Sequence, residues 1–200
     1  MARRNELAVF LRSCLPELQS PEAAALIEFA IALPLLVVLV IGIFDFGGAF
    51  NLKQELNNAA REGAAFGAVQ PTNDLLNSGT PPSVDAIRYL VASYLVQAAR
   101  INDCGLSGMP APGSQSAQMT WIYSTTGTCP GTLQLTIQRP CVAPKCPVIS
   151  GSPNVYIPYT YVKISYPYQW HFNNVIQLLV PGASYTLSAI TTDATAANMN

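Results

Sequence analysis

Few residues in this chain could carry out catalysis. The sequence contains a single histidine, His171, and only 10% of its residues are charged. General acid–base catalysis and metal binding combine histidines, carboxylates and thiolates, whereas His171 stands alone in the aromatic stretch YPYQWHF. This position favours packing or surface exposure over a role as a base. The sequence also has neither a nucleophile elbow nor a Walker loop, so we expect a protein that is not an enzyme and needs no cofactor or metal.

The cysteines predict disulfide bonds. Cys14 precedes a long apolar segment, and the other four of the five cysteines follow it, at Cys104, Cys129, Cys141 and Cys146. An even set on one side of such a segment is typical of an oxidising compartment. Cys141 and Cys146 enclose only VAPK, which is wider than the usual zinc knuckle, so a disulfide is favoured over a cysteine-only zinc site. By elimination, Cys104 would pair with Cys129.

One carboxylate, Glu28, has an unusual position. It directly precedes an uninterrupted apolar run, FAIALPLLVVLVIGIF, at residues 29–44. A carboxylate at membrane depth is costly, on the order of 3 kcal/mol on insertion scales. Two interpretations are open. Glu28 reaches water at the membrane interface, or it meets a positively charged group of a partner in an assembly.

The apolar run predicts a membrane anchor. With residues 23–28 it comprises about 22 residues, close to the length that a helix needs to cross a bilayer. A cleaved secretory signal is the alternative, but its apolar region is shorter and ends in a cleavage site, whereas a helical sequence follows here. We therefore expect a leader at residues 1–23, a transmembrane helix at residues 24–46, and contact with membrane lipid.

The orientation follows from charge and cysteines together. Arg3, Arg4 and Arg12 precede the span, and positive charges favour the cytoplasmic side. The four cysteines after the span point to the opposite compartment. These features predict a cytoplasmic N-terminus and a periplasmic domain at residues 71–200. The formal net charge of −1 argues against a nucleic-acid partner.

A stripe of small residues follows the span. Residues 47–70 are rich in helix formers and should continue the helix. Its small residues Ala60, Gly63, Ala64 and Gly67 recur at helical spacing. Such stripes let helices approach closely. The contact could be with the protein's own domain or with another subunit, and the sequence leaves both open.

The remaining sequence predicts a second helix and a small sheet. A linker at residues 70–82 precedes a helix expected at residues 83–101, with Ser83 as its cap. Residues 104–117 are expected to form a loop, residues 173–180 a helical turn, and the tail from Thr195 is expected to fray. Alternating apolar residues predict strands at residues 119–124, 133–138, 159–166 and 185–192. With one apolar face per strand, the fold class is α+β, with an antiparallel sheet covered on one side by helices.

The N-terminal third resembles the TadE-like family. The resemblance rests on Glu28-Phe29-Ala30, the span with GIFDFG, and LNNAAREGA at residues 56–64. It implies a pseudopilin or minor pilin of the tight-adherence branch of type IV pilus machines. It also implies a pilin-like domain on an inner-membrane helix, in homo- or hetero-oligomers with other pilins, pseudopilins and pilus assembly proteins.

The resemblance also implies a role for Glu28. Some members are cut by a prepilin peptidase so that this Glu becomes the fifth mature residue. In this chain Ala24 would be the new N-terminus and Ala23 would precede the cut, in place of the family's Gly. The freed amine of Ala24 could then pair with Glu28 of a neighbouring subunit. The alternative to pilus assembly is a membrane-anchored envelope binding module or adhesin that uses the aromatic-rich residues 156–170.

Overall fold

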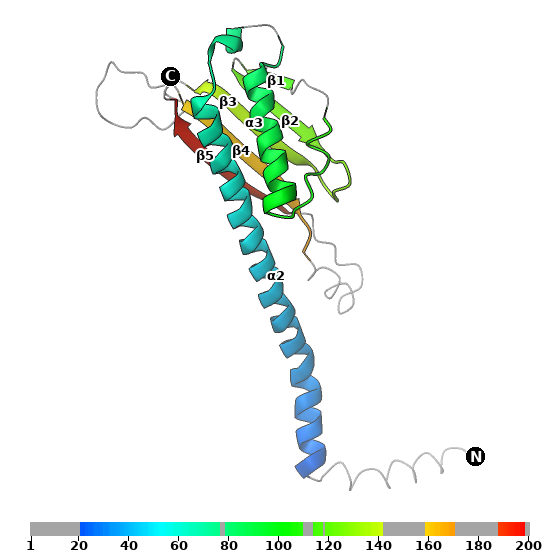
Figure 1. Ribbon diagram of the computed structural model, residues 1–200. Coiled ribbons are helices and arrows are strands. Elements are labelled where there is room, and N and C mark those ends of the chain that lie inside the picture. Colours follow the sequence, from blue (N-terminus) through cyan, green and yellow to red (C-terminus); the bar gives the residue numbers. More distant parts are fainter. Residues whose placement is uncertain are drawn as a thin grey trace, which may run out of the picture. The chain divides into compact units, whose positions relative to one another are not determined.

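The computed structural model describes residues 21–76, 79–109, 114–117, 119–141, 159–170 and 188–198 (Figure 1). The chain divides into two compact units. Of the described residues, the first unit holds residues 21–46 and the second holds those from Gly47 onward. Residues 1–20 of the expected leader, the helical turn at residues 173–180 and His171 lie outside the described residues, whereas residues 21–23 already belong to the first helix.

One long helix, α2, spans Pro21–Val69. It continues without a break through Pro34, Gly47 and Gly48. A proline within a membrane-spanning helix is tolerated. The predicted long N-terminal helix is therefore present. In the second unit its inward side is lined by Leu56 and a series of alanines, all nearly inaccessible to solvent.

The second helix begins differently from the prediction. The linker contains a 3₁₀ turn, η2 (Asn73–Leu76), followed by α3 (Pro82–Ser93) and one π-helical turn, η3 (Tyr94–Ala98). Ser83 is not the cap, because α3 starts one residue earlier with Pro82 at its first position, where proline suits a helix. Instead the Asp74 carboxylate accepts hydrogen bonds from Ser83 N at 2.8 Å and Ser83 Oγ at 3.1 Å. A negative charge at this end of a helix is favourable.

Five antiparallel strands form one sheet in the order β1-β2-β3-β4-β5. They are β1 (Ser114–Ala117), β2 (Thr120–Thr125), β3 (Leu133–Cys141), β4 (Tyr159–Tyr168) and β5 (Ser188–Ala197). The prediction missed β1, because Gly, Ser and Pro around it favour a loop. It was also wrong about the tail, since pairing with β4 extends β5 to Ala197, opposite Tyr159.

One face of the sheet is covered, as the alternation predicted. Helices α2 and α3 lie across this face (Figure 1), and the opposite face carries exposed polar residues such as Gln134 and Lys163. The helix-facing strand residues pair across the sheet, for example Trp121 with Ile137. The buried residues of the covered face are Trp121, Tyr123, Leu133, Leu135, Ile137, Val162, Ile164 and Tyr166.

The stripe of small residues on α2 faces the same domain. Ala60 and Ala64 are buried. A Cβ added at Gly63 would lie 2.7 Å from Val91 Cγ2 of α3, and one added at Gly67 would lie 2.5 Å from Thr160 Cγ2 of β4. Both distances are below ordinary carbon–carbon contact. The glycines therefore allow α2 to approach α3 and β4 closely.

We predict that Gly63→Leu and Gly67→Leu each destabilise the domain, by roughly 1–3 kcal/mol as is typical of overpacking. The matched control is Ala65→Leu, since Ala65 is exposed on the same helix. The measurement is the melting temperature of the full chain in detergent. Equal melting of the glycine variants and the control would contradict the close contact.

Candidate functional site

The first part of α2 is an apolar surface on all sides. Its large side chains are exposed, from 43% for Leu33 to 76% for Phe44. Successive residues of an α-helix are 100° apart, so exposed neighbours such as Leu26 and Ile27 face different directions. The helix is long and apolar enough to cross a membrane, and none of its most apolar stretch is buried by protein. This surface requires lipid or other apolar helices around it, which indicates a single-pass anchor.

Glu28 interrupts this apolar surface. It is exposed between Ile27 and Phe29, which are themselves 49% and 58% exposed. Ala24 is exposed one turn earlier, on the same side of the helix as Glu28, while Ala23 is partly buried. Asp45, near the far end of the span, is buried. Within the expected span, residues 24–46, Glu28 is thus the one exposed carboxylate.

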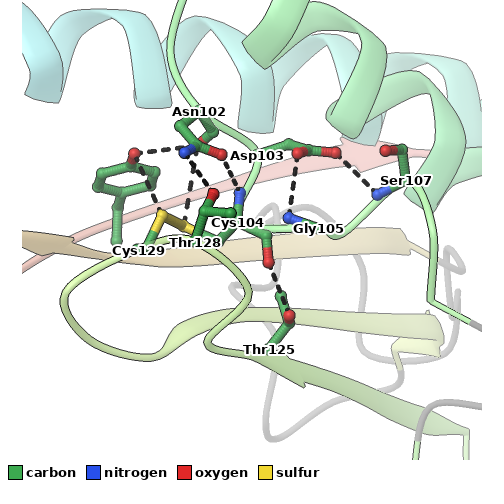
Figure 2. The surroundings of a disulfide bond; sticks show 9 residues. Asn102, Asp103, Cys104, Gly105, Ser107, Thr125, Thr128 and Cys129 are labelled. Atoms are coloured by element: carbon green, nitrogen blue, oxygen red, sulfur yellow. Dashed lines mark hydrogen bonds between the residues drawn. A yellow bond between two sulfur atoms is a disulfide. The ribbon is translucent and has the colours of Figure 1, made fainter.

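A disulfide fastens the segment after η3 to the turn between β2 and β3. It joins Cys104 and Cys129 (Figure 2). The Thr125 hydroxyl donates to the Cys104 carbonyl at 2.7 Å, and Tyr166 Oη of β4 donates to the Asn102 carbonyl at 2.9 Å. Side-chain bonds from two strands therefore hold the same short segment that the disulfide crosslinks.

Asp103 organises the loop beside the disulfide. Its Oδ1 accepts the Gly105 N–H at 3.1 Å and its Oδ2 accepts the Ser107 N–H at 2.8 Å (Figure 2). Burial by itself raises the pKa of Asp103, but the hydrogen bonds from Ser107 and Gly105 outweigh it and lower the pKa below its usual value. The ionised carboxylate is therefore the form that the fold stabilises.

A buried arginine ties α3 to this loop. Arg88 is only 1% exposed, and its Nε donates to Asp85 Oδ1 at 2.7 Å. Its Nη1 donates to the carbonyls of Leu106 at 2.5 Å and Ser107 at 3.3 Å. Burial by itself lowers the pKa of Arg88, but the interactions of its guanidinium with Asp85 and Tyr89 outweigh burial, so the pKa lies above its usual value. The prediction missed Arg88 and Asp103, although Asp85 and Arg88 have the spacing of a helical ion pair.

The second predicted disulfide, Cys141–Cys146, falls outside the described part of the chain. Cys141 ends β3, but its side chain, like Cys146, lies outside the described residues, so their disulfide stays a prediction. Within the described ranges, no cluster of three or more metal-ligating side chains is present. The aromatic residues of β4 contribute largely to packing, since Tyr159 and Tyr166 are buried.

The similarity to a known protein family lies in α2. Residues 23–65 match the TadE-like protein family. This match confirms the resemblance drawn from Glu28-Phe29-Ala30 and from residues 56–64. No curated protein and no solved structure matches the chain.

The TadE-like segment joins two kinds of helix surface. Its beginning is the exposed apolar anchor with Glu28, and its end contains Ala60, Gly63 and Ala64, which are buried in the domain. Gly67 and the Cys104–Cys129 disulfide lie beyond it. The TadE-like part therefore supplies the anchor and the contact with the domain, while the strands and the crosslinked loop belong to the remaining sequence.

We predict that Asp103→Asn destabilises the domain at pH 7 by roughly 1–2 kcal/mol, because an amide nitrogen cannot accept the second backbone N–H. The lowered pKa means that the carboxylate stabilises the fold above its unfolded pKa of about 3.9 and loses this effect as the pH falls through the folded pKa. The difference in melting temperature between wild type and variant should thus shrink on acidification below about pH 4.

The control for this prediction is Glu62→Gln, which removes an exposed carboxylate from α2. It should melt close to wild type at both pH values, with the disulfide intact in all proteins. A constant deficit of Asp103→Asn across the pH range would contradict the role of its ionised form.

Proposed function

We propose that this protein is a structural subunit, a pseudopilin or minor pilin, of a tight-adherence pilus or related secretion apparatus. The observation that carries the proposal is the TadE-like segment itself, whose first part is exposed and apolar on every side while its second part is packed into a domain. Such a helix needs apolar surroundings, which lipid or other helices supply. In the proposed role, partner pilins and assembly proteins contribute some of these contacts, and the protein is a member of an oligomer.

The proposed location is the inner membrane, with a cytoplasmic N-terminus and a periplasmic domain. Two features support this orientation. Arg3, Arg4 and Arg12 precede the anchor, and the Cys104–Cys129 disulfide lies in the domain that follows it. Arginines favour the cytoplasmic side, and disulfides persist in the periplasm.

Glu28 is the proposed assembly contact. A carboxylate exposed on an apolar helix is costly in lipid, and pairing with a cation of a neighbour would remove this cost. If the leader is cut between Ala23 and Ala24, the new amine of Ala24 supplies that cation one turn from Glu28. Pairing between subunits would also fix their stagger along the helix axis.

The alternative, an envelope adhesin with an aromatic sheet, has less support. It would need aromatic side chains on the open face of the sheet. Tyr166 instead lies in the core and donates its hydroxyl to the Asn102 carbonyl. Tyr159 and Tyr161 alternate with Lys163 on the open side of β4, but Tyr159 is buried against Ala197 and Tyr161 is only partly exposed.

The orientation predicts the activity of fusions. Alkaline phosphatase, which folds only in an oxidising compartment, should be active when fused after residue 200. A reporter that works only in the cytoplasm should be inactive there and active when fused before the anchor. The reverse pattern would contradict the proposed topology.

We predict that Glu28→Gln and Glu28→Leu insert into the membrane, fold and form the Cys104–Cys129 disulfide, yet lose association with partner pilins. The reason is that both variants lack the charge that a partner cation would meet. The measurement is crosslinking in the native envelope, together with pilus counts. Membrane extraction and non-reducing electrophoresis report insertion and the disulfide.

The matched control is Glu22→Gln, which removes an exposed carboxylate from the first turn of the same helix. It should assemble like wild type. Normal pili and crosslinks in Glu28→Leu would show that Glu28 is an interfacial residue and would remove it from the assembly site.

A further inference from the structure

The last strand of the sheet, β5, leaves one of its edges unpaired. It spans Ser188–Ala197 and pairs with β4 in an uninterrupted register, from Tyr159 opposite Ala197 to Tyr168 opposite Ser188. In the part of the chain that the structure describes, no strand pairs with its other edge. Figure 1 shows β5 at the margin of the sheet. Along this outer edge, every second residue of β5 points a backbone donor and acceptor that no described strand bonds.

Proteins usually protect such edges, and the sequence of β5 itself carries little of the usual protection. Short strands, bulges, prolines and lysines are the common devices. The opposite edge follows this rule, since β1 has four residues and its pairing with β2 is irregular. By contrast β5 is long and regular, and its sequence SAITTDATAA has neither proline nor lysine. Asp193 is its single charged residue.

The side chains of β5 indicate what could pair with it. On the helix-facing side Ile190, Ala194 and Ala196 pack against the core but are only partly buried. On the open side Asp193 is exposed. On the paired edge of β5, the neighbouring strand β4 places Val162 opposite Ala194 and Lys163 opposite Asp193. A strand on the outer edge that carried the same pattern would cover the aliphatic row and meet the same carboxylate.

We propose that the free edge of β5 is a docking site for one extended strand of another protein, with aliphatic residues toward the helices and a Lys or Arg beside Asp193. Backbone hydrogen bonds would supply affinity and the alternating side chains would supply selectivity. This surface is distinct from the anchor and Glu28.

A second copy of the chain is a poorer occupant. A two-fold contact pairs identical strands antiparallel and relates the two sheets by rotation about an axis through the sheet. This rotation keeps the open faces of both sheets on the same side. The registers of greatest overlap that pair like faces then put Asp193 directly opposite or diagonal to Asp193 of the second copy. Like charges opposed across strands are destabilising.

The probe is a synthetic peptide with the sequence of residues 160–166, TYVKISY, because β4 already pairs with β5. The full chain in detergent micelles should bind the fluorescent peptide saturably by anisotropy. A strand bonds through one edge at a time, so alternate residues point their N–H groups to opposite edges. Of two peptides, N-methylated at residues 161, 163 and 165 or at 162 and 164, one should lose binding and the other should keep it.

The charge is tested separately. Asp193→Lys should weaken binding of the peptide by roughly 3- to 10-fold, the range expected for reversing one cross-strand charge pair. Glu62→Lys, at an exposed site on α2, should leave the affinity unchanged. Because Asp193→Lys also places a lysine opposite Lys163 of β4, its melting temperature is measured and peptide binding is recorded well below it.

Three results would overturn the proposal. They are no binding by the wild-type chain, equal loss or equal retention of binding with both N-methylated peptides, and unchanged affinity in Asp193→Lys. A concentration-dependent dimer that Asp193→Lys abolishes would instead assign the edge to a second copy, against the proposal. The Glu28 and fusion experiments remain independent of these outcomes, so failure of the edge site and failure of the pilus role can be told apart.

Discussion

The close approach of α2 to α3 and β4 is the constraint on which the domain depends. At Gly63 and Gly67 there is no room for a Cβ, because Val91, Ile87 and Thr160 occupy that space. A helix held this closely covers the apolar face of β3 and β4 and brings α3 against the same face. Larger residues would lift α2 from the sheet and expose the row that includes Ile137 and Val162. The small residues of α2 thus allow one helix to contain both the apolar anchor and a part of the core.

Buried polar groups then fix the elements relative to each other within this domain. Arg139, fully buried on β3, donates to Thr160 Oγ1 of β4 at 3.2 Å and to the Gln70 carbonyl at the end of α2 at 2.9 Å. Thr160 in turn donates to Asn198 Oδ1 after β5 at 2.9 Å. Arg88 and the Asp103 loop do the same at α3. Because a buried charge that loses its partners is expensive, these contacts favour one arrangement of helices and strands over sliding alternatives.

Much of the architecture could be predicted because it follows from periodicity. The apolar run before Asp45, the spacing of Val84, Ile87 and Val91, and the alternation in β3 and β4 are local patterns that specify an element and its buried face. The missed features depend on distant residues. Asp74 replaces Ser83 as the cap from nine residues away, and the tail becomes strand only because β4 lies beside it.

The site was predictable to a different degree. The anchor and Glu28 are visible in the sequence, since an apolar run with one carboxylate needs no tertiary information. The partner of the small-residue stripe could not be predicted, because a stripe of Ala and Gly can pack against the protein's own domain or against a helix of another subunit. Burial of Arg88 and Asp103 also required the fold, because polar residues on a helix and in a Gly-rich loop normally face solvent.

The anchor surface with Glu28 and the outer edge of β5 differ in which atoms would distinguish one partner from another. In the anchor every interior backbone group is bonded within the helix, so only side chains can distinguish one neighbour from another, and a carboxylate such as Glu28 gives the strongest discrimination available on an apolar surface. At the outer edge of β5, no described strand pairs with the backbone. An extended chain could gain hydrogen bonds there, and Asp193 with the aliphatic row would supply the selection. In the proposed assembly, the stagger of subunits in the membrane and the contacts of the domain outside it would depend on separate interactions. A change at one surface then need not disturb the other.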